Sequence, residues 1–224
     1  MRPGWSESSP HGPLAYEPAQ RRRTRAGRQA VFLDRDGVLN ELVPDLYSGD
    51  PESPLAACDV HLIAGAAAAA RELTRAGFAL VCVSNQPAAA KGKATVELLQ
   101  AVHELVVDLL ARQQAQLDTS RLCPHHPHGT APALAKRCRC RKPRPGMLLD
   151  AAAALDLDLG SSWMIGDTDA DVAAGRSAGC RTILLEYPGS AHKRHDDAGP
   201  EMLAADLACA VALLLARVTP PDAA

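Results

Sequence analysis

The sequence predicts an α/β fold built on a doubly wound parallel sheet. Short apolar runs alternate along the chain with segments of helical periodicity, which is the pattern of parallel strands joined by helices. The expected strands are apolar at every position, as strands buried on both faces are. A chain of 224 residues, of which 47% are hydrophobic, is long enough to bury one sizeable core. We therefore expect a single α/β domain.

The first half of this domain is expected to hold two strands and two helices. Residues 30–33 (AVFL) form an apolar run that suits a buried parallel strand. Residues 65–76 are rich in alanine and precede Gly77, so they predict a helix with a glycine at its C′ position. Residues 78–83 predict a second buried strand, and residues 94–113 predict a long amphipathic helix.

The second half begins with an irregular segment in which Pro, His, Cys and basic residues are crowded together. Beyond it, helical and apolar segments alternate again, and Gly179 closes one of the helices. We expect an irregular loop over 121–146, a helix over 147–155, a strand over 162–165, a helix over 169–178, a strand over 181–185, a polar loop over 186–199 and a helix over 201–217.

The two ends of the chain are expected to lack regular structure. Residues 1–29 are rich in Pro, Gly, Ser and Arg and show no periodicity, so we interpret them as a disordered tail. Residues 218–224 contain two prolines and are expected to fray. The single domain then spans residues 30–217.

Composition and charge exclude several classes of protein. Aromatic residues make only 3% of the chain, too few for base-stacking nucleic-acid modules. The first 30 residues hold six Arg and two acids, a net +4, so the rest of a chain of net charge −2 carries −6; this opposes nucleic-acid binding by the body of the protein. We find no secretory signal, no apolar run near the roughly 20 residues of a membrane span and no long exposed apolar face. We expect a cytoplasmic monomer that binds neither nucleic acid nor membranes.

Polar side chains follow three of the expected strands. Asp34 and Asp36 come directly after the first strand. Ser84 and Asn85 end the second, and Asp167 follows the third. In such sheets the site lies beyond the carboxyl ends of the strands. Acids gathered there repel one another unless a cation lies between them, and carboxylate oxygens at an open site suit Mg²⁺. The sequence therefore predicts a magnesium site at this edge.

A basic segment, RCRKPRP at 139–145, lies further along the chain. Pro143 keeps Lys142 out of helical geometry. A lysine brought to a carboxylate cluster neutralises it and binds a phosphate as a point charge; the alternative is a solvated basic stretch. Asp169 follows the third strand as well; it either belongs with the acids at this edge or serves only as the N-cap of the next helix.

Three of the seven Cys and three of the eight His lie in one segment, 123–140. The odd number of cysteines argues against a regular disulfide framework. A Cys-x-His pair followed after a loop by Cys-x-Cys supplies the four ligands of a closed zinc site, although His126 or His128 could replace the first histidine. The zinc ligands assigned are Cys123, His125, Cys138 and Cys140.

Zinc in this loop would also fix the basic residues, because Cys140 lies two positions before Lys142. The other cysteines are interpreted differently. Cys58 stays unassigned in a loop, whereas Cys82, Cys180 and Cys209 lie in or beside apolar elements and are expected in the core.

Four motifs occur in a set order: DRDGVLN at 34–40, SNQ at 84–86, RKP at 141–143 and GDTDAD at 166–171. In this order, and on these elements, they resemble the motifs of the haloacid-dehalogenase (HAD) superfamily of phosphatases. The resemblance covers about residues 30–186. It implies a three-layer, Rossmann-like fold with a minimal cap and a magnesium-dependent phosphatase reaction.

The resemblance also implies a role for each residue at the strand ends. Asp34 would attack phosphorus and form an aspartyl-phosphate. Asp36 would protonate the leaving alcohol and later deprotonate water. Mg²⁺ would be held by Asp34, Asp167 and the backbone carbonyl of Asp36. Ser84 and Lys142 would hold the transferring phosphate, and Asn85 would position the loop or the substrate.

The cysteine and histidine spacing is similar to the zinc-containing, small-cap branch of the superfamily. That branch implies a small phosphorylated sugar as substrate, best matched by a heptose 1,7-bisphosphate. Histidinol phosphate or another sugar phosphate is the alternative, and a non-enzymatic zinc module binding nucleic acid is opposed by the acidic body of the chain. Arg141 would then contact the sugar or its second phosphate. Residues 41–50 and Thr168 depart from the branch's usual pattern around the leaving group.

Overall fold

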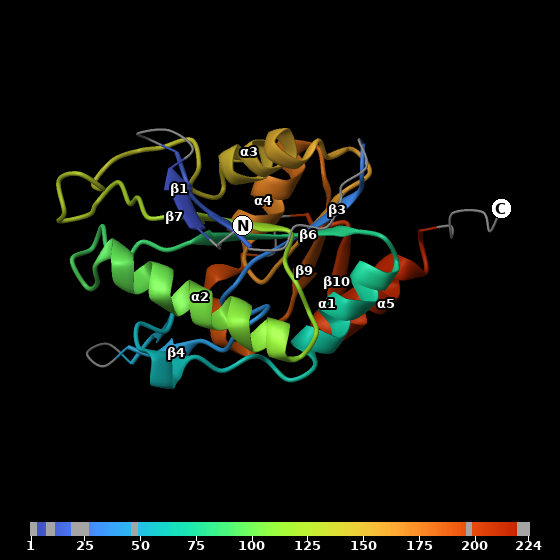
Figure 1. Ribbon diagram of the computed structural model, residues 1–224, viewed down its shortest axis with the longest axis horizontal. Helices are drawn as coiled ribbons and strands as arrows, with labels where there is room; N and C mark the ends of the chain where they lie inside the picture. The colour runs from blue at the N-terminus through green and yellow to red at the C-terminus, as the bar shows by residue number, and fades with distance from the viewer. Residues whose placement is uncertain (1–3, 8–11, 19–26, 46–48, 196–198, 219–224) are drawn as a thin grey trace.

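The computed structural model describes residues 4–7, 12–18, 27–45, 49–195 and 199–218. Its centre is an eight-stranded sheet in the order β1-β2-β7-β6-β3-β8-β9-β10, with helices on both faces (Figure 1). The six strands from β7 to β10 in this order run parallel, and only the pairs β1–β2 and β2–β7 are antiparallel. The predicted three-layer, doubly wound α/β fold is confirmed. Among the described residues, no helix is both long and apolar enough to cross a membrane.

The elements lie close to their predicted places, and the predicted helices up to residue 178 agree within two residues at each end. The strands of the main sheet are β1 (Gly4–Glu7), β2 (Leu14–Glu17), β3 (Ala30–Leu33), β6 (Ala79–Asn85), β7 (Thr119–Cys123), β8 (Trp163–Gly166), β9 (Arg181–Leu185) and β10 (Met202–Ala204). The helices are α1 (Ala66–Arg75), α2 (Val96–Arg112), α3 (Gly146–Leu155), α4 (Asp169–Ala178) and α5 (Leu207–Leu215).

Two hydrophobic cores lie on opposite faces of the sheet. Figure 1 shows α1, α2 and α5 on one side and α3 and α4 on the other. Leu73, Val106 and Leu214 bring the first three helices into one buried cluster, whereas Met147 and Ala174 belong to the other. Each helix therefore buries one apolar stripe against the sheet, which is what stabilises an amphipathic helix in a globular protein.

The central strand β3 connects these cores to the site. Val31 and Leu33 enter one core, Ala30 and Phe32 enter the other, and all four are fully buried. This alternation is the period-two geometry of a strand. Because β3 lies between β6 and β8, Asp34, the residue that follows it, lies at the centre of the carboxyl edge.

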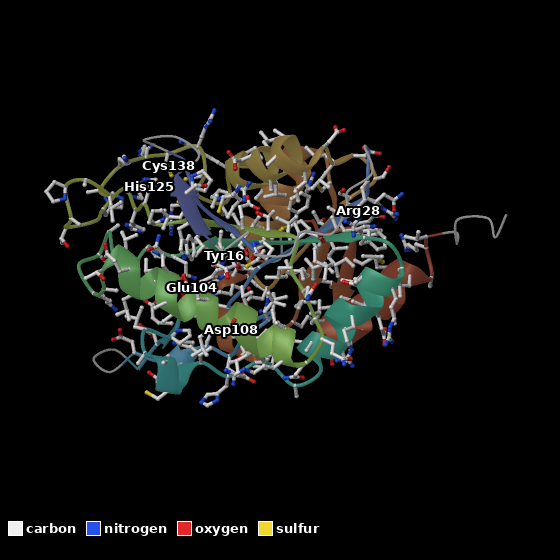
Figure 2. All side chains as sticks on the ribbon, in the orientation of Figure 1. Tyr16, Arg28, Glu104, Asp108, His125 and Cys138 are labelled. Atoms are coloured by element: carbon white, nitrogen blue, oxygen red, sulfur yellow. The ribbon has the colours of Figure 1, made fainter. Side chains whose placement is uncertain are left out.

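The expectation that residues 1–29 lack regular structure is wrong for two segments. β1 and β2 form an antiparallel hairpin, and β2 pairs with β7, so the hairpin extends the sheet. Trp5 and Tyr16 pack against the buried ring of His103 on α2, each with ring centroids 5.6 Å from it. Figure 2 shows Tyr16 beside Glu104 and Asp108 of the same helix. Three further parts of the expected tail, 1–3, 8–11 and 19–26, lie outside the described residues.

The expected irregular loop over 121–146 begins too early. Residues 119–123 form β7, and all five are buried. The pattern was missed because three of them are polar. Arg121 is satisfied inside the protein by Asp150, at 2.5 Å, and by Glu17, at 3.2 Å. The paired charges let an Arg occupy a buried strand.

The C-terminal region also differs from expectation. The helix expected over 201–217 is divided into β10 and α5, because Asp206 accepts a hydrogen bond from the backbone N–H of Cys209 and begins a new helix as its N-cap. Cys209 is exposed, so its assignment to the core is wrong. The polar loop after β9 contains a short 3-10 helix, η2 (Pro188–Lys193). Residues 219–224, most of the expected frayed end, lie outside the described residues.

The segment between β3 and α1 holds little regular structure. Its described residues form only a small antiparallel hairpin, β4 (Val43–Pro44) with β5 (Pro51–Glu52), and a short 3-10 helix, η1 (Ala57–Asp59). This hairpin supplies one wall of the cavity described below.

Candidate active site and metal centres

The loop after β3 turns sharply enough to place two carboxylates in one cavity. Asp34 and Asp36 are both buried and both line it. Gly37 has a positive φ of 81°, and a Cβ there would collide with the carboxylate of Asp167. Glycine is therefore required on two counts, since it tolerates positive φ and lets Asp167 approach the backbone.

Three carboxylates meet beyond β3 and β8. Ligand oxygens of Asp34, Asp167 and Asp171 lie within 4.8 Å of one another. Burial, with smaller contributions from neighbouring acids, raises the pKa of Asp34 to about 6 and that of Asp167 to about 8. Carboxyl groups with raised pKa values at such short separations are typical of a site that gathers charge for a cation.

This cluster fits a hard cation. All of its donors are carboxylate oxygens, as Mg²⁺ prefers. Asp167 Oδ1 is buried and has no hydrogen-bond partner among the described residues. The predicted Asp34 and Asp167 are brought together, whereas the Asp36 side chain lies outside the cluster.

Sequence reasoning missed Asp171 as a member of the cluster. The only signal was its place as the third acid of GDTDAD. It also closes a capping box: its Oδ2 accepts from the Thr168 N–H at 3.0 Å and from the Thr168 hydroxyl at 2.6 Å. Asp169, for which a cap was the alternative, instead accepts a hydrogen bond from the backbone N–H of His195 at 2.6 Å.

Lys142 balances the carboxylates. Its ammonium lies 3.0 Å from Asp34 Oδ1 and 2.5 Å from Asp171 Oδ1, and it donates to the Val83 carbonyl at 2.8 Å. Although burial opposes the charged form, these two acids raise the pKa of Lys142 above its usual range. Lys142 is therefore a fixed positive charge within reach of any phosphoryl group bound at Asp34.

Asp36 lies among hydrogen-bond donors. Burial, the largest single influence, raises its pKa, but the adjacent Arg35 guanidinium, at 3.1 Å, and the neighbouring hydrogen-bond donors together lower that pKa below its usual value. Three more donors also act to lower this pKa: Asn40 at 2.9 Å, Ser53 at 2.8 Å and Gln86 at 2.6 Å. These three partners were not assigned from the sequence, although Asn40 and Gln86 stand inside quoted motifs. Asp36 is therefore held as a carboxylate, ready to accept a proton.

The second strand end provides the remaining expected groups. Ser84 is buried, lines the cavity and accepts a hydrogen bond from Gln86 at 3.1 Å. Asn85 bonds twice to the backbone of Lys142, accepting from its N–H at 3.0 Å and donating to its carbonyl at 3.1 Å. The cavity has a volume of about 450 Å³ and also reaches Arg141, a size in the range of small-ligand sites.

A second cluster lies in the loop between β7 and α3. The Sγ atoms of Cys123, Cys138 and Cys140 are 3.3 to 3.6 Å apart, and His125 Nδ1 lies 3.4 Å from Cys140 Sγ and 3.7 Å from Cys123 Sγ. These separations exceed an S–S bond and approach the edge of about 3.8 Å expected for a tetrahedron with 2.3 Å Zn–S bonds. Figure 2 shows His125 and Cys138 close together in this loop.

The other two histidines of the loop are placed differently. The rings of His126 and His128 pack against each other, with centroids 5.9 Å apart, and neither belongs to the ligand cluster. All four members of the cluster, Cys123, His125, Cys138 and Cys140, are buried. The choice that spacing left open therefore falls on His125.

Comparisons with known proteins agree with this geometry. A HAD-hydrolase-like family model matches residues 139–210. The D-glycero-β-D-manno-heptose-1,7-bisphosphate 7-phosphatase of Rhodopseudomonas palustris is 40% identical over 159 residues, covering 71% of this chain and 84% of the relative. That of Escherichia coli K12 is 39% identical over 160 residues, covering 71% and 80%. The D,D-heptose 1,7-bisphosphate phosphatase of B. bronchiseptica, crystallised with magnesium and phosphate, is 29% identical with a TM-score of 0.70, covering 85% of this chain and 99% of that one.

The fold and the site define a HAD-type phosphatase, a phosphoric monoester hydrolase. The superfamily resemblance inferred from the four motifs is thereby confirmed. Within this class, the chain belongs to the family of D-glycero-β-D-manno-heptose-1,7-bisphosphate 7-phosphatases.

Proposed function

We propose that the protein hydrolyses the 7-phosphate of D-glycero-β-D-manno-heptose 1,7-bisphosphate through an aspartyl-phosphate on Asp34. One observation carries the reaction: the Asp34 carboxylate lies in a cavity at the carboxyl edge of the sheet, 3.0 Å from the ammonium of Lys142. The names of the relatives support the choice of sugar. The geometry of the site supports phosphoryl transfer, which is largely a matter of positioning and charge stabilisation.

In the first half-reaction, an Asp34 oxygen bonds to phosphorus while the bond from phosphorus to the sugar oxygen breaks. Ser84 and Lys142 hold the phosphoryl oxygens. Asp36 gives a proton to the departing alkoxide. It is held as a carboxylate before substrate arrives, so it must first take up a proton, which the nearby phosphate dianion favours by raising its pKa.

In the second half-reaction, water attacks phosphorus and gives its proton to Asp36. The bond between Asp34 and phosphorus then breaks, so inorganic phosphate leaves and Asp34 returns as a carboxylate. Asp36 returns to its starting carboxylate by releasing to solvent the proton that it took from water, which balances the proton taken up before the first step. The four donors around Asp36 fix the position of its carboxylate and keep it ionised, so that it has a free acceptor site when this proton is transferred.

Mg²⁺ is the proposed cofactor of this site. Asp34, Asp167 and the backbone carbonyl of Asp36 would hold it, and Asp171, whose carboxylate belongs to the same cluster, joins this set. When bound, it supplies positive charge that neutralises the acids and orients the phosphoryl oxygens.

Zn²⁺ is proposed for the second cluster. Cys123, His125, Cys138 and Cys140 would complete its coordination, and four protein ligands leave no open position for catalysis. The role is therefore structural. The zinc would hold the loop from which Arg141 and Lys142 reach the active-site cavity.

We also propose that the protein is a cytoplasmic monomer. The cluster needs reduced cysteines, which the cytoplasm maintains, and no disulfide joins the seven cysteines. The large exposed apolar side chains are scattered over separate elements: Leu98, Leu149, Leu203 and Leu213.

The test is a kcat/KM panel with Mg²⁺, using both anomers of heptose 1,7-bisphosphate and histidinol phosphate. The β anomer should be the best substrate, and the product should be heptose 1-phosphate. Asp34→Asn should lower kcat on the order of 10⁴-fold or more. Unchanged turnover in Asp34→Asn would overturn the mechanism, and a preference for histidinol phosphate would overturn the substrate.

A further inference from the structure

The segment after β9 is fastened to the catalytic loop after β8. The guanidinium of Arg194 donates to the carbonyl of Asp167 at 3.2 Å, and the hydroxyl of Ser190, a fully buried residue, donates to the same carbonyl at 3.1 Å. The backbone N–H of His195 donates to Asp169 at 2.6 Å. These contacts fall on either side of Thr168.

The same segment is also tied together internally. Arg194 donates to the Tyr187 carbonyl at 2.8 Å and to the Ser190 hydroxyl at 2.8 Å. The Tyr187 hydroxyl donates to Glu41 at 2.6 Å. A short 3-10 helix anchored at both of its ends is a rigid support, and side chains on it lose little freedom when they bind a ligand.

This support carries His192 and Lys193, and both residues line the active-site cavity. Neither forms an ion pair within the described part of the chain, unlike the cavity's Lys91, which lies 3.7 Å from Glu52, and Lys142, which pairs with catalytic acids. Thr168 cannot supply a charge nearby, because it is neutral and its hydroxyl is committed to the helix cap.

Two further acids line the cavity, in addition to Asp34, Asp36 and Asp167. Asp50 and Glu52 belong to the hairpin region before η1. The ammonium of Lys193 on η2 attracts an anionic group on a bound substrate, whereas at the hairpin the charge of Lys91 offsets that of Glu52. The distribution of charge therefore distinguishes the two ends of an elongated, doubly charged ligand.

We propose that Lys193 and His192 form a second anion subsite, which binds the phosphate that is not hydrolysed. The inference rests on the proposed function and extends it, by assigning selectivity for bisphosphates to η2. Lys193 contributes a compact charge that binds phosphate without a fixed orientation, and His192 adds a ring N–H donor.

The test compares two substrates that differ only in the second phosphate, heptose 1,7-bisphosphate and heptose 7-phosphate. Lys193→Ala should raise KM for the bisphosphate roughly 10- to 100-fold, the worth of a charge-assisted hydrogen bond, with kcat unchanged. KM for the monophosphate should stay within about twofold, and Lys193→Arg, which keeps the charge, should behave like wild type. Arg112→Ala, which removes an exposed cation outside the cavity, is the matched control.

Equal effects of Lys193→Ala on both substrates, or none on either, would overturn the subsite. A wild type that hydrolyses neither heptose would contradict the proposed function instead. The subsite is then decided by inhibition of phenyl phosphate hydrolysis. Fructose 1,6-bisphosphate should inhibit wild type more strongly than fructose 6-phosphate does, and Lys193→Ala should abolish the difference; persistence of the difference would refute the subsite.

Discussion

Asn85 and Lys142 are joined by two hydrogen bonds between the side-chain amide of the first and the backbone of the second. The pair connects the end of β6 to the last turn of the cysteine-rich loop, two residues after Cys140. It places the ammonium of Lys142 between Asp34 and Asp171. The position of Lys142, the proposed phosphate-binding cation, thus depends on an amide from a different strand.

Truncation of this amide should therefore impair catalysis more than stability. Asn85→Ala is expected to lower kcat about 10- to 100-fold, because a displacement near 1 Å of a catalytic group costs about that much. Ser161→Ala, which also removes a side chain that makes a local hydrogen bond, should leave kcat unchanged. Steady-state kinetics with thermal unfolding measure both quantities. Normal kcat in Asn85→Ala would show that Lys142 needs no such support.

Removal of zinc should destabilise the loop. The hydrogen bond with Cys123 and burial raise the pKa of the Cys138 thiol to about 12, so zinc must displace its proton on binding. Elemental analysis should give about one Zn²⁺ per chain, and the double variant Cys138→Ser/Cys140→Ser should lose the metal and unfold at lower temperature. Cys209→Ser, at an exposed thiol on α5, is the control. A metal-free wild type of full stability would refute the zinc site.

Affinity for Mg²⁺ should rise with pH. With pKa values of about 6 for Asp34 and about 8 for Asp167, the metal-free site is partly protonated at pH 6 and becomes ionised as the pH passes 8. Each displaced proton strengthens binding by about tenfold per pH unit in this window. Isothermal titration calorimetry in buffers of different ionisation enthalpy measures the proton release. Equal affinity at pH 6 and pH 8 would contradict these pKa values.

Burial of His103 should make stability depend on pH. Burial, and after it the charge of Arg35, lowers the pKa of His103 from 6.5 to about 3, against a smaller opposite effect of Asp36. Neither ring nitrogen has a hydrogen-bond partner among the described residues. In the unfolded chain His103 is therefore protonated below pH 6.5, whereas in the folded chain it is protonated only below about pH 3. The free energy of unfolding consequently decreases as the pH falls from 6.5 to about 3.

Between pH 7.5 and pH 5 this effect amounts to about 2 kcal/mol, at about 1.4 kcal/mol per pH unit below 6.5. Urea unfolding of wild type and His103→Leu at both pH values measures the free energy of unfolding. Its decrease from pH 7.5 to pH 5 should be smaller in the variant by this amount. His61→Leu, at an exposed histidine, should retain the wild-type dependence. A parallel decline in wild type and His103→Leu would indicate that the imidazole ionises inside the fold.

The sequence was sufficient for the features that depend on local pattern. Apolar runs and helical periodicity predicted the four central parallel strands and four of the five helices. Because carboxyl ends of parallel strands share an edge, the sequence pattern alone predicts that Asp34, Ser84 and Asp167 lie together. The spacing of Cys123, Cys138 and Cys140 likewise predicted a ligand cluster.

Only the tertiary structure decided the features that depend on distant partners. β7 has a polar sequence that becomes buried because Arg121 finds Asp150 and Glu17, and β2 joins the sheet through pairing with that strand, more than a hundred residues away. Asp171 was not assigned from the sequence, and it joins the acidic cluster because the fold brings it beside Lys142, Asp34 and Asp167. The physical reason is the same in each case: local periodicity encodes which face of an element is buried, whereas burial of a charge is decided by the partner that compensates it.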